Sequence, residues 1–361
     1  MLWPHSSLNT LFEACLSRRW RIRPTDEERG LSMKALLAMP QDQQHLMFTP
    51  AQLTELAELV EIDIGRTVPD LSGAPDDELV DVEVLLTGWG SPLLDAETLA
   101  RLPALRAVVH TAGTMRRIAT EALWDREDIL VTTAARANAV PVAEYTVAQI
   151  LLAGKQSLRR ESAHRSCRGQ ERTSALDLGG NYGAVVGLIG ASRVGREVAL
   201  LLRHFDLSVL ISDPYASDEE IRQLGAEPSD LAHLFRLSDV VSLHAPDVPA
   251  TRGMVTRELL SSMQDGTTFI NTARPALVDL EALREQVLSG RLSAVLDVHD
   301  DLAVDDPLWE APAVSITPHI AGSLGNELHR LGESALEEVR RLRAREPARH
   351  PVDRSSLAIV A

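Results

Sequence analysis

The chain has 361 residues, 45% of them hydrophobic, and a formal net charge of -16 at pH 7. A chain of this length is too long for one small hydrophobic core and is typical of two domains of ordinary size. The negative charge argues against nucleic acid or an anionic membrane surface as a partner, because either would need a basic face. Any anionic substrate must therefore be held by a local group of arginines.

The cysteine content is low, with Cys15 and Cys167 alone in the sequence. This excludes a disulfide framework and a cysteine-based zinc site, and it favours a reducing compartment. No apolar run approaches the ~18 residues that span a bilayer. We therefore expect a cytoplasmic protein with no membrane association and no metal site.

The first 32 residues differ from the rest. They carry scattered tryptophans and arginines, with no clean amphipathic period and no signal-peptide core. Met33 then opens MKALLAMP, which looks like a first strand. We interpret residues 1–32 as an extension, either a translated upstream region or a disordered segment, with Met33 as the biological start. The alternative is a genuine helix over 7–18.

From residue 33 short strands alternate with helices. We expect strands over 34–38, 82–87 and 107–111, and helices over 50–62 and 95–101. Such alternation indicates a parallel sheet with crossover helices.

A longer helix is expected over 140–166, with Pro141 in its first turn and an apolar face that includes Val142, Tyr145, Ile150 and Leu151. We interpret it as the connector between the domains, and 165–181 as an exposed loop.

The segment from 184 to 215 has the order that a dinucleotide needs. An apolar strand over 185–189 leads into a turn at Gly190, a helix starts near Val194, and a second strand stops at Asp213. The amino end of such a helix points free N–H groups at a pyrophosphate. Asp213 lies 18 residues after Gly195, near the usual spacing of ~20 residues for the ribose-binding acid. The alternative is an ordinary βαβ crossover with a tight glycine turn.

Two residues refine this prediction. Ser192 stands where the motif normally has its second glycine, and we expect its hydroxyl to donate to a phosphate oxygen, with altered geometry and a risk of weak cofactor binding. Asp213 accepts hydrogen bonds from both ribose hydroxyls of NAD and repels the 2′-phosphate of NADP. Pro214 and Tyr215 supply no cation that would favour NADP, so we expect NAD.

Four later apolar strands each end in polar residues. These are His244 and Pro246, Thr272 and Arg274, the acidic run 297–301, and His319. In an open parallel sheet the carboxyl ends of the strands face one crevice, where ligands bind. A helix then follows, with Leu328, Leu331, Leu336, Val339 and Leu342 at helical spacing and Pro347 just past its end. It most simply folds back on the N-terminal half.

Taken in order, six segments resemble the D-isomer-specific 2-hydroxyacid dehydrogenases, which include phosphoglycerate dehydrogenase-like enzymes. They are VVGLIGASRVGR, SDPY, VVSLHAPDVPATRGMV, FINTARPALVD, LSAVLDV and ITPHIAGS, and the likeness covers about 84–345. The resemblance implies hydride exchange between nicotinamide and a 2-oxo or 2-hydroxy acid, usually by a homodimer. It also implies that Arg274 clamps the substrate carboxylate and polarises the carbonyl, and that His319 is the acid/base.

These roles suit the chemistry. Hydride addition to a ketone builds negative charge on oxygen, so a cation and a proton donor are needed there. The planar guanidinium of arginine matches a carboxylate, and histidine can both give and take a proton near neutrality.

The chain departs from the family at the glutamate that holds the histidine. That position is Leu302, and the loop to Pro307 is about two residues short. Alignment backwards from Pro307 puts Asp300 in the place of the glutamate, with Asp301 next to it. Asp300 is the expected partner of His319, Asp301 is the alternative, and a histidine with neither partner would have a lower pKa.

The resemblance also assigns the remaining contacts. Asp297 is implied to approach the nicotinamide carboxamide, with Thr272 and Ala273 as backbone neighbours. The implied cofactor site consists of Thr114, Gly190, Ser192, Arg193, Val194, Asp213, His244, Pro246, Thr251, Thr272, Ala273, Asp297 and Gly322.

In the first domain, Gly113 and Thr114 are implied to present amides to the substrate carboxylate, although Met115 replaces a family glycine. Gly88 and Trp89 form a pocket wall in the functional interpretation, whereas Trp89 could equally be packing. Arg116 and Arg117 either bind a second anionic group of the substrate or are a solvated pair of cations.

We therefore expect an α/β protein of two Rossmann-like, doubly wound parallel-sheet domains, with the active site in the cleft between them. The substrate domain begins with 33–137, the NAD-binding domain is 138–320, and 321–350 is the C-terminal helix returning to the substrate domain, followed by a tail at 351–361. Two alternatives remain, a sibling dehydrogenase of a small inorganic or one-carbon acid, and an NAD-sensing, corepressor-like protein without turnover. Ser192 and the altered glutamate loop favour the latter, whereas the presence of Arg274 and His319 argues against it.

Overall fold

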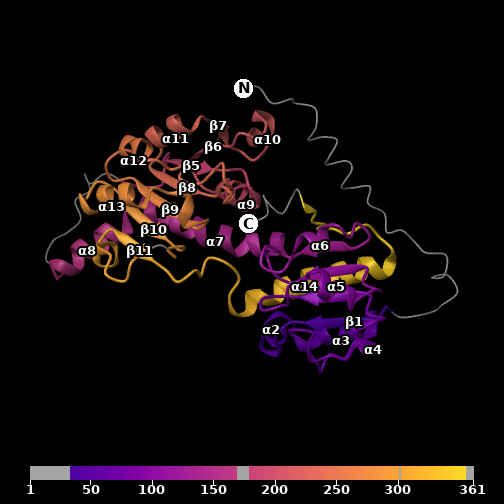
Figure 1. Ribbon diagram of the computed structural model, residues 1–361. Coiled ribbons are helices and arrows are strands. Elements are labelled where there is room, and N and C mark those ends of the chain that lie inside the picture. Colours follow the sequence, from indigo (N-terminus) through magenta and orange to yellow (C-terminus); the bar gives the residue numbers. More distant parts are fainter. Residues whose placement is uncertain (1–32, 169–178, 301, 355–361) are drawn as a thin grey trace. The chain divides into compact units, whose positions relative to one another are not determined.

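The computed structural model describes residues 33–168, 179–300 and 302–354 (Figure 1). The described chain forms two compact units. Unit 1 contains the residues up to Asn138 and those from Leu324 onward, and unit 2 is Ala139–Ser323. The expected extension over 1–32, the alternative helix within it and Asp301 lie outside the described residues.

Unit 1 is built on a four-stranded parallel sheet. Its strands lie in the order β1 (Ala35–Ala38), β2 (Val84–Thr87), β3 (Ala107–His110) and β4 (Leu130–Thr133). The connecting helices are α2 (Gln41–Met47), α3 (Pro50–Leu59), α4 (Asp76–Leu79), α5 (Ala96–Ala100) and α6 (Glu121–Trp124). Helices α2, α4 and α6 and strand β4 were not predicted.

The last helix of the chain, α14 (Leu328–Ala344), belongs to the core of unit 1. It packs against α2 and α3. A Cβ atom on Gly332 would lie 2.1 Å from the carbonyl oxygen of Met47, so only glycine permits this approach of α14 to the end of α2. The apolar face predicted for this helix is buried there.

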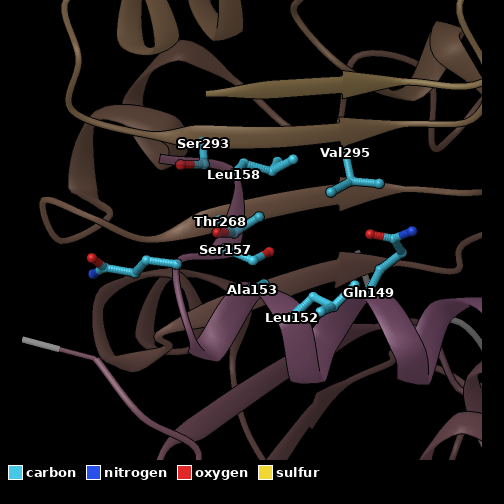
Figure 2. Close-up of a pocket in the computed structure, with 9 residues that line it drawn as sticks. Gln149, Leu152, Ala153, Ser157, Leu158, Thr268, Ser293 and Val295 are labelled. Atoms are coloured by element: carbon cyan, nitrogen blue, oxygen red, sulfur yellow. The ribbon is translucent and has the colours of Figure 1, made fainter. Parts of the chain in front are cut away.

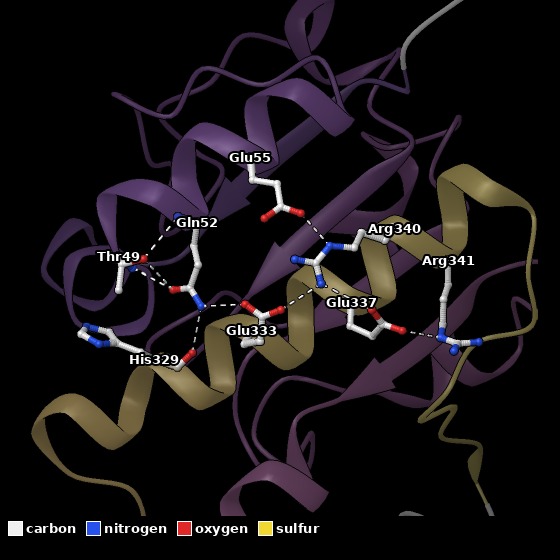
Figure 3. Close-up of polar contacts among 8 residues, drawn as sticks. All are labelled: Thr49, Gln52, Glu55, His329, Glu333, Glu337, Arg340 and Arg341. Carbon is white, nitrogen blue, oxygen red and sulfur yellow. Dashed lines mark hydrogen bonds and ion pairs between the residues drawn. The ribbon is translucent and has the colours of Figure 1, made fainter.

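Polar contacts also join α14 to α3 (Figure 3). The guanidinium of Arg340 pairs with Glu55 at 2.6 Å and Glu333 at 2.8 Å. Gln52, which closes a capping box with Thr49 at the start of α3, donates through Nε2 to Glu333. One arginine therefore bridges carboxylates of two helices that are distant in sequence.

Unit 2 contains a seven-stranded parallel sheet in the order β11-β10-β9-β8-β5-β6-β7. The strands are β5 (Val185–Ile189), β6 (Ser208–Ser212), β7 (Glu227–Pro228), β8 (Val240–Leu243), β9 (Thr268–Asn271), β10 (Ser293–Leu296) and β11 (Val314–Ile316). The chain turns back at β5, which lies between β6 and β8, and such a switch point is where open α/β sheets bind ligands.

Its helices include α9 (Arg193–Leu202), α10 (Asp218–Gln223), α11 (Leu231–Leu237), α12 (Arg257–Ser262) and α13 (Leu280–Leu288). The prediction of an α/β protein with parallel sheets is confirmed.

The predicted connector helix over 140–166 is wrong in its bounds. The structure has α7 (Ala135–Gly154) and a separate α8 (Ser157–Ser166), so Pro141 lies inside a helix rather than in its first turn. Contacts from a distant segment cap the end of α7, since Nδ2 of Asn181 donates to the carbonyl oxygen of Leu151 at 3.1 Å and the amide of Gly180 donates to that of Gly154 at 2.7 Å. A Cβ atom on Gly154 would lie 2.0 Å from Oδ1 of Asn181, so this close approach needs glycine. Gln156 then adopts a left-handed conformation with φ 51°. Residues 165 and 166, where the predicted helix and the predicted loop overlapped, are helical.

Candidate active site

The glycine turn lies at the carboxyl end of β5. Gly190 has φ +100°, and a Cβ atom there would lie 3.0 Å from backbone atoms of His244 and Ala245. A Cβ atom on Gly195 would lie 2.1 Å from the carbonyl oxygen of Gly190. The turn therefore needs glycine at both positions, one for its conformation and one for the close packing of α9.

Ser192 is the N-cap of α9. Its Oγ accepts a hydrogen bond from the amide of Gly195 at 3.3 Å. Because the oxygen is the acceptor, the hydroxyl proton can still be donated to an anion. Arg193 and Val194 form the first turn, whose N–H groups and dipole favour negative charge. These residues fit the pyrophosphate of a dinucleotide.

Asp213 follows β6 and lies beside this turn. Its Oδ2 accepts from the amide of Ala191 at 2.7 Å, and its Oδ1 accepts from the amides of Tyr215 and Ala216 at 2.7 and 3.1 Å. Each carboxylate oxygen can accept further hydrogen bonds, as the ribose hydroxyls of a bound nucleotide require.

The ends of β8 and β9 supply the next residues. His244 is buried beside Ser242, with 3.0 Å between Nε2 and Oγ, and burial lowers the pKa of His244 to about 3. The imidazole of His244 is therefore uncharged at pH 7, and it packs beside the glycine turn without carrying a proton for catalysis. Thr251 closes the following loop by donating to the carbonyl oxygen of Pro246 at 2.5 Å.

The turn that carries Arg274 is shaped by Asn271. Oδ1 of Asn271 accepts from the amide of Ala273, and Nδ2 donates to the carbonyl oxygen of Arg274, both at 3.0 Å. Thr272 contacts Thr146 of α7 through the two hydroxyls, 3.3 Å apart. Asn271 was not predicted, although an amide side chain directly before Thr272 and Arg274 is a signal for such a turn.

His319 lies in a loop held by Asp297. Oδ1 of Asp297 accepts from Oγ1 of Thr317 at 2.6 Å and from the amide of Ile320 at 2.8 Å, and Oδ2 accepts from the amide of Ala321 at 2.9 Å. The side chain of Asp297 is buried, whereas His319 is exposed and has φ 57°. Gly322 ends the same loop.

The expected pairing of Asp300 with His319 is not formed in the described structure. No hydrogen bond or ion pair joins the two side chains among residues 33–168, 179–300 and 302–354, and Asp300 is exposed. Its neighbour His299 packs edge-on against Trp309, with ring centroids 5.2 Å apart. The shortened loop therefore fixes His299, and Asp300 points into solvent.

In unit 1, the residues predicted to contact the substrate lie in two loops, after β2 and after β3. The amide of Gly88 donates to Oγ of Ser91 at 2.7 Å. Trp89 is 42% exposed, and both interpretations of it, pocket wall and packing, stay predictions.

His110 holds the second loop. Its Nδ1 lies 2.9 Å from Oγ1 of Thr87 and its Nε2 lies 3.1 Å from the carbonyl oxygen of Thr114. Burial lowers the pKa of His110 to about 4, so the ring is neutral, and a carbonyl oxygen can only accept. Nε2 therefore carries the proton. Gly113 and Thr114 are partly exposed, Met115 is buried, and Arg116 and Arg117 are exposed.

Two hollows lie elsewhere. A cavity of about 10 Å³, room for one water, lies beside the break between α7 and α8. Figure 2 shows residues that line it, among them Gln149, Thr268 and Ser293. A hollow of about 360 Å³ in unit 1 is lined in part by Lys34 and Glu61. Both lie at the amino ends of strands, away from the residues above.

No set of three His, Cys, Asp or Glu side chains among the described residues could hold a metal ion. None of their helices is long and apolar enough to cross a membrane.

Comparison with known proteins identifies these features. Residues 148–321 match the model of the D-isomer specific 2-hydroxyacid dehydrogenase, NAD binding domain. The chain is 33% identical over 255 residues to a D-3-phosphoglycerate dehydrogenase of Mycobacterium tuberculosis, covering 68% of this chain and 47% of that protein. It thus spans about half the length of such relatives.

Two further similar proteins are matched over more of their own length. An (S)-sulfolactate dehydrogenase of Chromohalobacter salexigens is 33% identical over 255 residues, covering 69% of this chain and 81% of the relative. The solved structure of a D-lactate dehydrogenase from Aquifex aeolicus, complexed with NAD and lactic acid, has a TM-score of 0.62 and 28% identity, covering 85% of this chain and 94% of that one.

The glycine turn, the N-terminus of α9 and Asp213 lie within the matched domain, and its cofactor is NAD. The chain belongs to the D-isomer specific 2-hydroxyacid dehydrogenase family.

Proposed function

We propose that the protein is an NAD-dependent oxidoreductase that exchanges a hydride with a 2-oxo or 2-hydroxy acid. The observation that carries the proposal is the anchoring of the His319 loop by buried Asp297, in the same unit as Arg274 and the glycine turn. The two groups that the reaction needs at the substrate oxygen, a cation and a proton donor, are thus presented by β9 and β11 of one sheet.

Bound NADH supplies the hydride in the direction of reduction. We propose that His319 gives a proton to the carbonyl oxygen in reduction and takes it back in oxidation. Arg274 holds the substrate carboxylate and stabilises negative charge on the oxygen. The amides of Gly113 and Thr114 and the exposed loop of Gly88 and Trp89 are the proposed substrate contacts of unit 1.

Asp300 is the proposed partner of His319. Catalytic hydrogen bonds often tighten only in the complex with substrate, and we propose that Asp300 and His319 pair in that state. A shorter side chain on a shorter loop must then move to reach the imidazole. Asp301 remains the alternative.

The names of two relatives support a proposal for the class of substrate. Phosphoglycerate and sulfolactate, the substrates in the names of two relatives, each carry a second anionic group beside the carboxylate. Arg116 and Arg117 directly follow the loop of Gly113 and Thr114 and are exposed. We propose that they favour a doubly anionic acid, and the alternative is a solvated pair.

The test is NADH oxidation by the purified protein with a panel of 2-oxo acids, from glyoxylate and pyruvate to branched, aromatic, dicarboxylic, phosphorylated and sulfonated members. We expect turnover, with the highest kcat/KM for a doubly anionic acid. The double variant R116Q/R117Q should lower that preference without lowering turnover of pyruvate. An equal loss with all acids would contradict the role of these arginines.

A second candidate is a cofactor-sensing protein without turnover, favoured by the unpaired geometry of Asp300 and His319. It predicts measurable NADH binding and no oxidation with any acid of the panel. We further propose a homodimer in the cytoplasm. Sedimentation equilibrium tests the dimer, and a monomer at micromolar concentration would contradict it.

A further inference from the structure

We propose that Tyr145, on α7, is a positioning residue that sets His319 in its reactive conformation through Thr317 and Asp297. The inference rests on the proposed function for its catalytic consequence. Its structural part stands on hydrogen bonds within unit 2. Tyr145 OH lies 3.0 Å from Oγ1 of Thr317, a residue 172 positions away in the sequence.

The direction of these hydrogen bonds follows from donor counting. Thr317 has one hydroxyl proton, and it is donated to Oδ1 of Asp297, because an ionised carboxylate can only accept. The hydroxyl of Tyr145 must therefore be the donor to Thr317. Burial, with a further contribution from the Asp297 carboxylate, raises the pKa of Tyr145, which keeps this proton in place.

This series of hydrogen bonds, from Tyr145 through Thr317, ends at the carboxylate of Asp297, which shapes the turn of His319. The amide of His319 donates to the carbonyl oxygens of Asp297 and Thr317 at 3.0 and 2.9 Å. The next two amides, of Ile320 and Ala321, donate to the carboxylate of Asp297. The turn is thus specified by Asp297, and Tyr145 orients the hydroxyl that shares this carboxylate with the turn.

The backbone of His319 needs this support. Its φ of 57° is in the left-handed region, which non-glycine residues adopt at a cost and keep only where the surroundings impose it. The side chain of His319 is exposed, and within the described residues no side-chain hydrogen bond or ion pair fixes it instead. Loss of the Tyr145 hydroxyl should therefore widen the distribution of His319 conformations without changing the glycine turn.

The test is Tyr145→Phe, with Tyr182→Phe as the matched control, since Tyr182 is 90% exposed in the same unit. We expect Y145F to lower kcat by about tenfold, the effect of one hydrogen bond. The Kd of NADH should stay at the wild-type value, and the melting temperature should fall by only about 2–4 °C, the effect of one lost hydrogen bond. Thr317→Val should act similarly, the double variant should cost no more than either single one, and Thr317→Ser should keep activity because it keeps the hydroxyl.

A second readout is independent of turnover. Hydrogen exchange of the amides of His319, Ile320 and Ala321 should be faster in Y145F than in wild type and unchanged in Y182F. If the wild-type protein oxidises no NADH with any of the 2-oxo acids, the proposed function fails. Hydrogen exchange still decides whether Tyr145 supports the turn of His319. Unchanged exchange together with unchanged kcat in Y145F would overturn the inference.

Discussion

The backbone amide of Ala191 donates a 2.7 Å hydrogen bond to Oδ2 of Asp213, which ties the glycine turn to the carboxyl end of β6. The same carboxylate accepts two amides of the residues that follow it. One side chain thus fixes the shape of the turn, and we propose that its negative charge distinguishes the two nicotinamide cofactors.

Asp213→Ser should shift cofactor preference. It removes the charge that repels a 2′-phosphate and the strong acceptor for the ribose hydroxyls, so we expect the ratio of NADH to NADPH affinity to fall by about tenfold or more. Fluorescence titration with both cofactors measures this ratio without a substrate. The control is Asp206→Ser, an exposed acid of the same unit. A ratio equal to that of wild type would remove Asp213 from cofactor selection.

Asp300→Asn should move the pH–rate profile of reduction. A carboxylate beside an imidazolium raises the pKa of the histidine, and reduction needs the protonated form. Without the carboxylate the alkaline limb of the profile should move to lower pH, by about one unit. The control is Asp305→Asn in the same loop, where Asp305 is exposed. An identical profile for wild type and D300N would exclude Asp300 as the partner of His319.

The two buried histidines should make stability depend on pH. Burial lowers the pKa of His244 to about 3 and that of His110 to about 4, from an ordinary value of 6.5. The unfolded chain therefore binds more protons between these values, and the free energy of unfolding falls as the pH drops from 6.5 toward 4. The slope from one such group is about 1.4 kcal/mol per pH unit.

His244→Gln should reduce this slope by the contribution of one titrating group, up to about 1.4 kcal/mol per pH unit. Urea unfolding of wild type and H244Q at pH 4.5, 5.5 and 6.5 measures it. Equal slopes for the two proteins would show that His244 is already protonated in the folded state.

Arg340→Gln should destabilise unit 1 modestly. The guanidinium bridges Glu55 and Glu333 (Figure 3), and these partners raise its pKa further above its usual range. Because the side chain is partly exposed, we expect a loss of about 1 kcal/mol in the free energy of unfolding, decreasing with added salt. Arg330→Gln, on the exposed face of the same helix, is the control. A loss independent of salt would indicate packing of the arginine stem instead.

The cofactor-binding segment could be predicted from the sequence because its signals are local. A strand, a glycine turn, an amphipathic helix and an acid at a fixed spacing lie within 184–215. Arg274 and His319 were identified through resemblance, since a lone arginine or histidine after a strand has no period or spacing to mark it.

The remaining features depend on contacts between distant segments. The end of α7 is set by Asn181, and the turn of His319 involves Tyr145, 172 positions from Thr317. No window of the sequence contains both partners of either contact. The prediction that 140–166 is one helix was wrong for this reason, and Tyr145 was assigned to an apolar face with no indication of its polar partner.

The position of α14 has a consequence for synthesis of the chain. Unit 2 is one uninterrupted stretch, Ala139–Ser323, whereas unit 1 needs α14 to cover α2 and α3. Since domains fold as their residues leave the ribosome, unit 2 has its whole sequence first, and the apolar faces of α2 and α3 wait for the last helix. We therefore expect unit 1 to complete its core only after unit 2 has its full sequence, because the residues of α14 are synthesised after Ser323.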